Sequence, residues 1–182
     1  ASSTPSSPGQ DPCTAWTGRD LNKILFQKIF DCVILFTFMS FENKVVIITG
    51  ASSGIGEATA KLFSQKEAKV LCVARSEEKL RSLTENIKGE YIAIDITENT
   101  AAERIVKKAI DLWGKIDVLV NAAGIIQSGN IETTKIEDFD YMMNINVRSI
   151  FLLMQKVVPY LKETKGNIVN VSSVTGLRAF PN

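Results

Sequence analysis

The chain has 182 residues, 45% hydrophobic and 23% charged, which suits one folded domain and excludes a wholly disordered or collagen-like protein. Its formal charge is only +1, so electrostatic binding to nucleic acid or to an anionic membrane surface is not expected. It has no His, and Cys13, Cys32 and Cys72 are widely spaced. A metal site, a disulfide framework and His-based nucleophilic catalysis are therefore not expected.

The first 43 residues differ from the rest of the chain. Residues 1–18 include twelve Ser, Thr, Pro or Gly, a composition that cannot bury enough surface to fold. Residues 21–41 are partly apolar, but their uninterrupted apolar stretch is about half of the ~20 residues that a bilayer span needs. We interpret residues 1–43 as a disordered or artefactual leader, with Met39 as the preferred start; membrane attachment through residues 21–41 is the alternative.

From Lys44 onward, short β-branched runs alternate with longer segments of helical periodicity. This alternation predicts an α/β fold with a doubly wound parallel sheet of order 3-2-1-4-5. One helix is expected to bury Ile55, Ala58, Leu62 and Phe63, and a longer one over 136–162 to kink near 144–147. The expected strands are 44–49, 69–74, 90–94, 117–121 and 167–172.

The first predicted strand runs directly into the glycine-rich turn GASSGIG. Gly50, Gly54 and Gly56 allow a sharp turn and a close approach of backbone to a ligand, and the helix that follows offers unpaired N–H groups. The pattern predicts a phosphate cradle, with an ordinary strand-to-helix turn as the alternative. Because no Gly-Lys-Ser/Thr follows, a P-loop NTPase is disfavoured.

Several motifs in order resemble the short-chain dehydrogenase/reductase family over residues 44–182. Thr49–Gly56 match its T-G-x-x-x-G-x-G motif, and Asn121–Gly124 match N-A-A-G; Asp95, Asn146 and Ser173 also match. The resemblance implies a Rossmann-type fold, incomplete at its C-terminal end. It also implies a nicotinamide cofactor and hydride transfer between that cofactor and a small-molecule secondary alcohol or ketone.

By the same resemblance, Asp95 lies beside the adenine ring, Asn121 stabilises the sheet, and the small residues after it leave room for the cofactor. The alternatives are a helix N-cap at Asp95 and a plain tight turn at 121–124. The cofactor-binding residues implied in this way are Thr49, Gly50, Ser52, Ser53, Gly54, Ile55, Gly56, Arg75, Asp95, Ile96, Asn121, Ala122, Ala123, Gly124 and Ser172.

The end of the second strand bears on the choice between NADP and NAD. An NAD-binding protein usually has an acidic residue there, but this chain has Ala74 followed by Arg75. Arg75 could bind the 2′-phosphate of NADP, which favours NADP and leaves NAD open. The alternative is a solvated Arg75 that pairs with Glu77 or Glu78. The preference for NADP is weakened because Ser53 supplies no second basic residue in the glycine turn.

Ser173 and Asn146 are the expected catalytic residues. The resemblance implies that the Ser173 hydroxyl binds the substrate oxygen, while Asn146 kinks its helix and holds a water in the proton relay. The alternatives are a capping Ser-Ser turn at 172–173, a surface role for Asn146, and Asn144 in its place.

The Tyr-x-x-x-Lys pair of the family has no match in this chain. Tyr91, Tyr141 and Tyr160 all precede Ser173, and none has Lys four positions later. We interpret the chain as a C-terminal truncation that catalyses poorly alone, with an exposed fifth strand and marginal stability. A non-catalytic nucleotide-binding protein is the alternative. The parent is expected to be a cytoplasmic homo-oligomer.

Overall fold

The computed structural model describes residues 40–176, and within them five parallel strands form one sheet. Their order is β3-β2-β1-β4-β5, which confirms the doubly wound topology. The expected leader lies outside the described residues apart from 40–43. The strands are β1 (Val45–Thr49), β2 (Lys69–Ala74), β3 (Glu90–Ala93), β4 (Val118–Asn121) and β5 (Asn167–Asn170).

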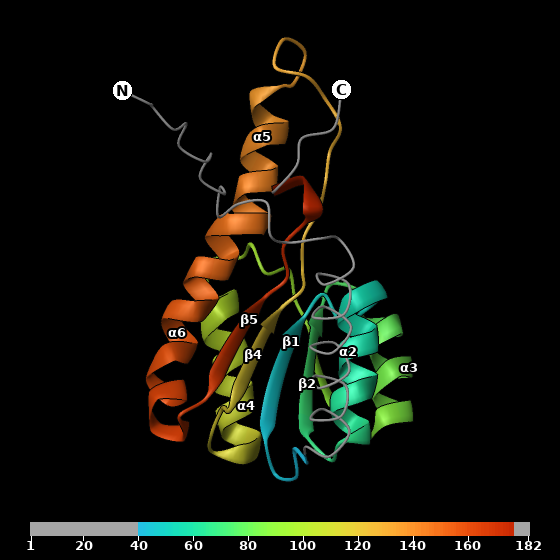
Figure 1. Cartoon of the computed structure of the whole chain (residues 1–182), viewed down its shortest axis with the longest axis vertical. Coiled ribbons are helices and arrows are strands. Elements are labelled where there is room, and N and C mark those ends of the chain that lie inside the picture. Colours follow the sequence, from blue (N-terminus) through green and yellow to red (C-terminus); the bar gives the residue numbers. More distant parts are fainter. Residues whose placement is uncertain (1–39, 177–182) are drawn as a thin grey trace, which may run out of the picture. The chain divides into compact units, whose positions relative to one another are not determined.

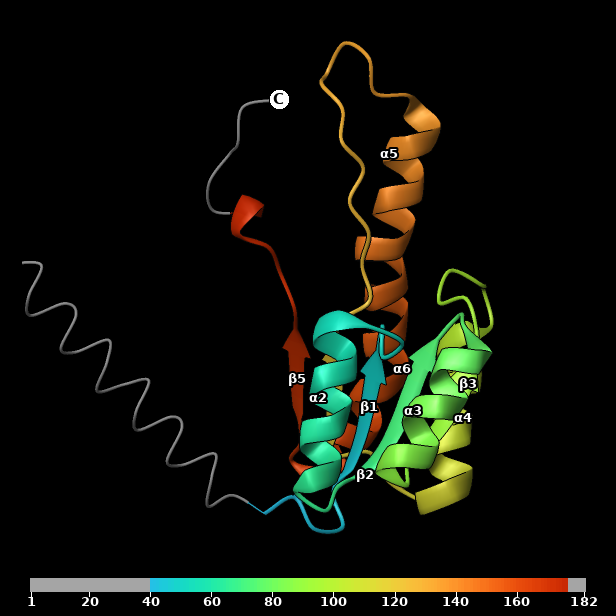
Figure 2. The same cartoon turned by 90° about the vertical axis from the view of Figure 1, so that its right-hand side faces the viewer.

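Helices cover both faces of the sheet, with α2 and α3 on one face and α4 and α6 on the other (Figures 1 and 2). Alternate strand side chains divide between two hydrophobic clusters: Ile47 packs toward α4 and α6, whereas its neighbours Val46 and Ile48 pack toward α2 and α3. Burial on both faces explains the continuous apolar runs of the central strands. The helices are α2 (Gly54–Gln65), α3 (Glu77–Ile87), α4 (Ala101–Trp113), α5 (Ile136–Met143) and α6 (Ser149–Thr164).

The strand register aligns polar residues at the carboxyl edge of the sheet. Thr49 of β1 is level with Asn121 of β4, and Asn121 is level with Asn170 of β5. The chain leaves β1 toward one face and β4 toward the other, so this edge is the switch point of the topology, where open α/β sheets bind ligands.

Helix α2 turns a different face to the sheet from the one predicted. Ile55 is 62% exposed, Leu62 is 41% exposed and Ala58 is also exposed, so the expected stripe is wrong except for the half-buried Phe63. The buried residues are Gly56 and Ala60. Their small size lets the helix lie close to the sheet, which large side chains at these positions would prevent.

A π-helical turn, Asn144–Arg148, joins α5 to α6 at the predicted kink. Such turns often occur at functional sites. Helix α5 projects beyond the carboxyl ends of the strands, beside the segment that follows β4 (Figures 1 and 2). Within residues 40–176, none of the helices combines the length and the apolar character needed to span a bilayer.

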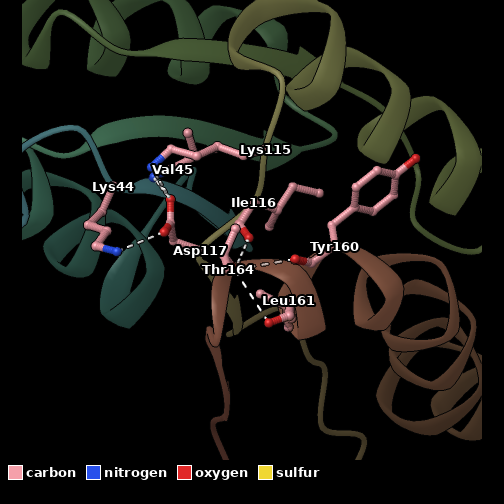
Figure 3. Close-up of polar contacts among 8 residues, drawn as sticks. All are labelled: Lys44, Val45, Lys115, Ile116, Asp117, Tyr160, Leu161 and Thr164. Atoms are coloured by element: carbon pink, nitrogen blue, oxygen red, sulfur yellow. Dashed lines mark hydrogen bonds and ion pairs between the residues drawn. The ribbon is translucent and has the colours of Figure 1, made fainter.

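The opposite edge of the sheet is tied together by Asp117, whose side chain is only 4% exposed (Figure 3). Its two carboxylate oxygens accept hydrogen bonds from the ammonium groups of Lys44 and Lys115, both at 2.9 Å. The same carboxylate accepts the backbone N–H of Val45 at 2.9 Å, while the Asp117 carbonyl accepts the N–H of Asn167 at 3.0 Å. One residue thereby connects the amino ends of β1, β4 and β5.

The hydrogen bonds decide the ionisation of Asp117. Burial alone would raise the pKa of its carboxyl, but the Val45 N–H and the two lysines outweigh burial and hold the pKa below its usual value. A lowered folded-state pKa stabilises the fold above the ordinary carboxyl pKa of about 4. That stabilisation is lost as the pH falls through the lower, folded-state value.

We expect Asp117→Asn to lower the free energy of unfolding at neutral pH by about 1–3 kcal/mol, because the ion pairs with both lysines are lost. Urea unfolding over a pH series measures this difference, which should shrink as the pH falls below about 4. Asp111→Asn removes an exposed pair with Lys107 and serves as the control, with an expected change under ~0.5 kcal/mol. Equal effects of the two substitutions would contradict the role of Asp117.

Candidate functional site

A cavity of about 640 Å³ opens at the carboxyl edge of the sheet, over the ends of β1, β2 and β4. Its walls come from the glycine turn and from the segments that follow β2, β3 and β4. Twelve of the fifteen predicted cofactor-binding residues line it: Gly50, Ser52, Ser53, Gly54, Ile55, Gly56, Arg75, Asp95, Ile96, Ala122, Ala123 and Gly124.

Two of the glycines occupy positions that have no room for a side chain. Gly50 has a φ of +69°, and a Cβ there would lie 2.8 Å from the Ala122 carbonyl oxygen and the Ala123 nitrogen. A Cβ on Gly56 would lie 2.7 Å from the carbonyl carbon of Gly50. The turn therefore lies against both the start of α2 and the N-A-A-G segment. The first N–H groups of α2, which lack partners within a helix, belong to residues that line the cavity.

The Thr49 hydroxyl holds the glycine turn and the N-A-A-G segment together. Its Oγ1 accepts the backbone N–H groups of Ala122 and Ala123, each at 3.2 Å, and the residue is 1% exposed. Thr49 is therefore behind the cavity wall and not on it. A hydroxyl at the last position of β1 fixes the spacing between two segments that are far apart in the sequence.

Asn121 is also behind the cavity. Its Nδ2 donates to Oδ1 of Asn170 at 2.8 Å, a side-chain link between the ends of β4 and β5. Among the buried side-chain oxygen and nitrogen atoms of residues 40–176, the Oδ1 of Asn121 is the one without a hydrogen-bond partner. This placement fits the sheet-stabilising role that the sequence suggests.

Asp95 lines the cavity after β3, and its carboxylate is oriented by the next residues. Oδ1 accepts the N–H of Thr97 at 2.9 Å and the Thr97 hydroxyl at 2.8 Å. The Thr97 N–H chiefly lowers the pKa of Asp95, and the charge of Arg75 adds to that effect, so the group is an acceptor at neutral pH. The alternative of an N-cap is wrong, because α4 begins at Ala101 and is preceded by Thr100.

Arg75 follows β2 directly and lines the cavity. Its guanidinium donates to the Tyr141 hydroxyl at 3.4 Å, whereas Glu77 pairs with Arg81 at 3.0 Å. The alternative of an Arg75 that pairs with the neighbouring acids is therefore wrong. Sequence reasoning missed two polar residues on the same wall, Ser76 and Lys79.

The side chain of Asn146 makes two bonds to one residue. In the π-helical turn, its Oδ1 accepts the N–H of Ile125 at 2.9 Å and its Nδ2 donates to the Ile125 carbonyl at 2.8 Å. It is half-buried, and it fixes the segment that lines the cavity after Gly124. An unremarkable surface role is therefore wrong for Asn146. The side chain of the rival Asn144 accepts a hydrogen bond from Arg148 at 3.4 Å.

Ser172 and Ser173 follow β5, which ends at Asn170 and is two residues shorter than predicted. Both are exposed, and neither lines the cavity. Cys72 is buried in β2, and burial raises the pKa of its thiol to about 12, so it is no nucleophile. In the part of the chain that the structure describes, no group of His, Cys, Asp and Glu side chains forms a metal site.

Comparison with known proteins places this geometry in a family, since the model of the short chain dehydrogenase family matches residues 44–182. The chain belongs to this family. An oxidoreductase of Thermotoga maritima is 47% identical over 149 residues, which cover 79% of this chain and 59% of that protein. A 3-oxoacyl-acyl-carrier-protein reductase FabG of the same organism is 41% identical over the same share of this chain and 61% of its own length.

Solved structures agree with the fold. The apo-form glucose dehydrogenase of Caenorhabditis elegans superposes with a TM-score of 0.68 at 37% identity, over 75% of this chain and 57% of that one. The KRED1-Pglu enzyme gives 0.70 at 30% identity, over 75% and 59%. The chain thus spans about three fifths of the length of these relatives.

We expect Thr49→Val to lower the free energy of unfolding by about 1–2 kcal/mol, because two backbone N–H groups lose their acceptor while the side-chain shape is kept. Thermal or urea unfolding measures this loss. The control is Thr59→Val on α2, whose hydroxyl only donates to the Ile55 carbonyl within the helix. That change should stay within ~0.5 kcal/mol, and an equal loss in both variants would contradict the linking role of Thr49.

Proposed function

We propose that the cavity binds a nicotinamide dinucleotide and that the protein transfers a hydride between this cofactor and a secondary alcohol or ketone. The observation that carries the proposal is the absence of room for a side chain at Gly50 and Gly56, beside a helix start that lines a large cavity. Backbone N–H groups at such a position suit the negative charge of a diphosphate. The bound nicotinamide would supply the hydride chemistry.

The other walls fit the remaining parts of a dinucleotide. The Asp95 carboxylate can accept hydrogen bonds from an adenine amino group, and Ala122, Ala123 and Gly124 leave space for a ribose. Among the relatives, a 3-oxoacyl reductase and a glucose dehydrogenase support an alcohol or ketone as the substrate class. The proposed cofactor-binding set is the one predicted from the sequence. In it, Thr49 and Asn121 act from behind the wall, and Ser172 follows β5 outside the cavity lining.

NADP is the proposed cofactor. Arg75 lines the cavity at the end of β2, where the preceding residue is Ala74 and no carboxylate repels a 2′-phosphate. A guanidinium makes charge-assisted hydrogen bonds to phosphate oxygens.

We expect Arg75→Glu to weaken NADPH binding by ~30-fold (about 2 kcal/mol) and to change NADH binding little, because a repulsive charge replaces an attractive one. Titration by nicotinamide fluorescence measures both. Arg81→Glu makes the same change in net charge on α3 but away from the cavity, and it should leave both affinities nearly unchanged. Equal weakening of NADPH and NADH by Arg75→Glu would argue against NADP preference.

Asn146 and Ser173 are the proposed catalytic residues, with Ser172 on the cofactor side. Asn146 holds the Ile125 backbone beside the cavity, and Ser173 follows the carboxyl end of β5. Neither supplies a proton donor of the family's Tyr type, and none of the three tyrosines precedes a Lys by four positions. We therefore propose that this chain alone binds the cofactor but reduces ketones slowly.

We expect the 182-residue chain to oxidise NADPH with ketones at least ~100-fold more slowly than a longer product that carries Tyr-x-x-x-Lys after Ser173, because general acid catalysis supplies about that factor. NADPH absorbance under single-turnover conditions measures both rates. Equal rates would contradict the need for the pair. A longer product that binds NADPH without turnover would favour a non-catalytic nucleotide-binding protein.

Self-association is a further part of the proposal. Tyr141, Met143, Val147 and Phe151 are exposed on the helical path from α5 to α6, with exposed fractions of 41–59%. Exposed apolar groups that gather in this way are typical of protein interfaces. A cytoplasmic location also stays a prediction. Its alternative is membrane attachment through residues 21–41, and most of these residues lie outside the described part of the chain.

A further inference from the structure

We propose that Lys79, in the first turn of α3, is a second cation for the 2′-phosphate of the dinucleotide and so sets the preference for NADP over NAD. This inference rests on the proposed dinucleotide site. It concerns a residue that neither the glycine motif nor the position after β2 indicates.

The position of Lys79 at the cavity carries the inference. Lys79 and Arg75 line the same cavity, and Asp95 is the only other charged residue among those that line it. Lys79 also lines a second cavity, of about 600 Å³, between α2 and α3, which shares Ser52 and Ser53 with the first. Lys79 therefore borders both cavities, and it lines the first one together with Arg75 and Ser76.

The charge of Lys79 is available to a ligand. Within residues 40–176, the ion pairs on α2 and α3 join Lys61 to Glu57 and Arg81 to Glu77, and Lys79 takes part in none of them. Among the described residues, Arg75 donates to the Tyr141 hydroxyl and forms no ion pair with a carboxylate. Neither of the two cations that line the cavity is therefore held in an ion pair.

The neighbouring polar groups suit a phosphate and not a ribose hydroxyl. Ser76 lines the cavity and precedes α3, yet its side chain makes no capping hydrogen bond, so its hydroxyl can donate to an anion. The Asp95 carboxylate already accepts hydrogen bonds from the N–H and the hydroxyl of Thr97. A dianionic group bound by two cations and a hydroxyl gains charge-assisted hydrogen bonds that a neutral diol cannot make.

The test compares Lys79→Ala with the native chain in titrations with NADPH, NADH, adenosine 2′,5′-bisphosphate and adenosine 5′-monophosphate. We expect Lys79→Ala to weaken the two 2′-phosphorylated ligands by about tenfold and the other two by less than twofold. The difference should shrink as salt is added, because both cations are exposed. Lys79→Arg should keep the native preference.

Lys61→Ala is the matched control, since it removes the same charge from the neighbouring helix, at the second cavity but not at the first. It should leave all four affinities within about twofold, well below the tenfold effect of one charge-assisted contact. Equal weakening of NADPH and NADH by Lys79→Ala, or no change in either, would overturn the role of Lys79 while leaving the dinucleotide site intact. A native chain that binds neither dinucleotide would overturn the proposed function and, with it, this inference.

Discussion

The close approach of two strand ends determines the shape of the site. The Thr49 hydroxyl accepts the backbone N–H groups of Ala122 and Ala123. Gly50 lies against the same backbone, so a Cβ on Gly50 would overlap with Ala122 and Ala123. Gly56 then brings the start of α2 against the carbonyl of Gly50. The helix begins beside the cavity because no side chain separates these three segments. The proposed binding of a diphosphate depends on that spacing.

The two edges of the sheet satisfy their polar groups in opposite ways. At the amino edge, Asp117 meets two ammonium groups and two backbone partners within the protein. At the carboxyl edge, the first N–H groups of α2 and the cations Arg75 and Lys79 line a cavity. Buried polar groups are normally paired inside the fold, so groups left at a cavity are the ones available to a ligand. Stability and binding are thereby assigned to different ends of the same strands.

The sequence was sufficient for the strand order and for most of the cavity wall, because buried parallel strands and a glycine turn each have a distinctive local pattern. It failed on α2, where the largest apolar residues, Ile55 and Leu62, are exposed and the small Gly56 and Ala60 are buried. Hydrophobicity alone cannot indicate how near a helix lies to its sheet. Lys79 was missed for a related reason, since only the position of α3 brings it to the cavity.

Amide hydrogen exchange with and without NADPH tests the binding site most directly. Slower exchange is expected at residues 50–56 and at Ala122–Ile125, where the ligand would cover backbone N–H groups, and no change is expected at the exposed helical path of α5 and α6. Because exchange reports each segment separately, it needs no turnover. Protection confined to other segments, or none at saturating NADPH, would contradict a dinucleotide bound at the glycine turn.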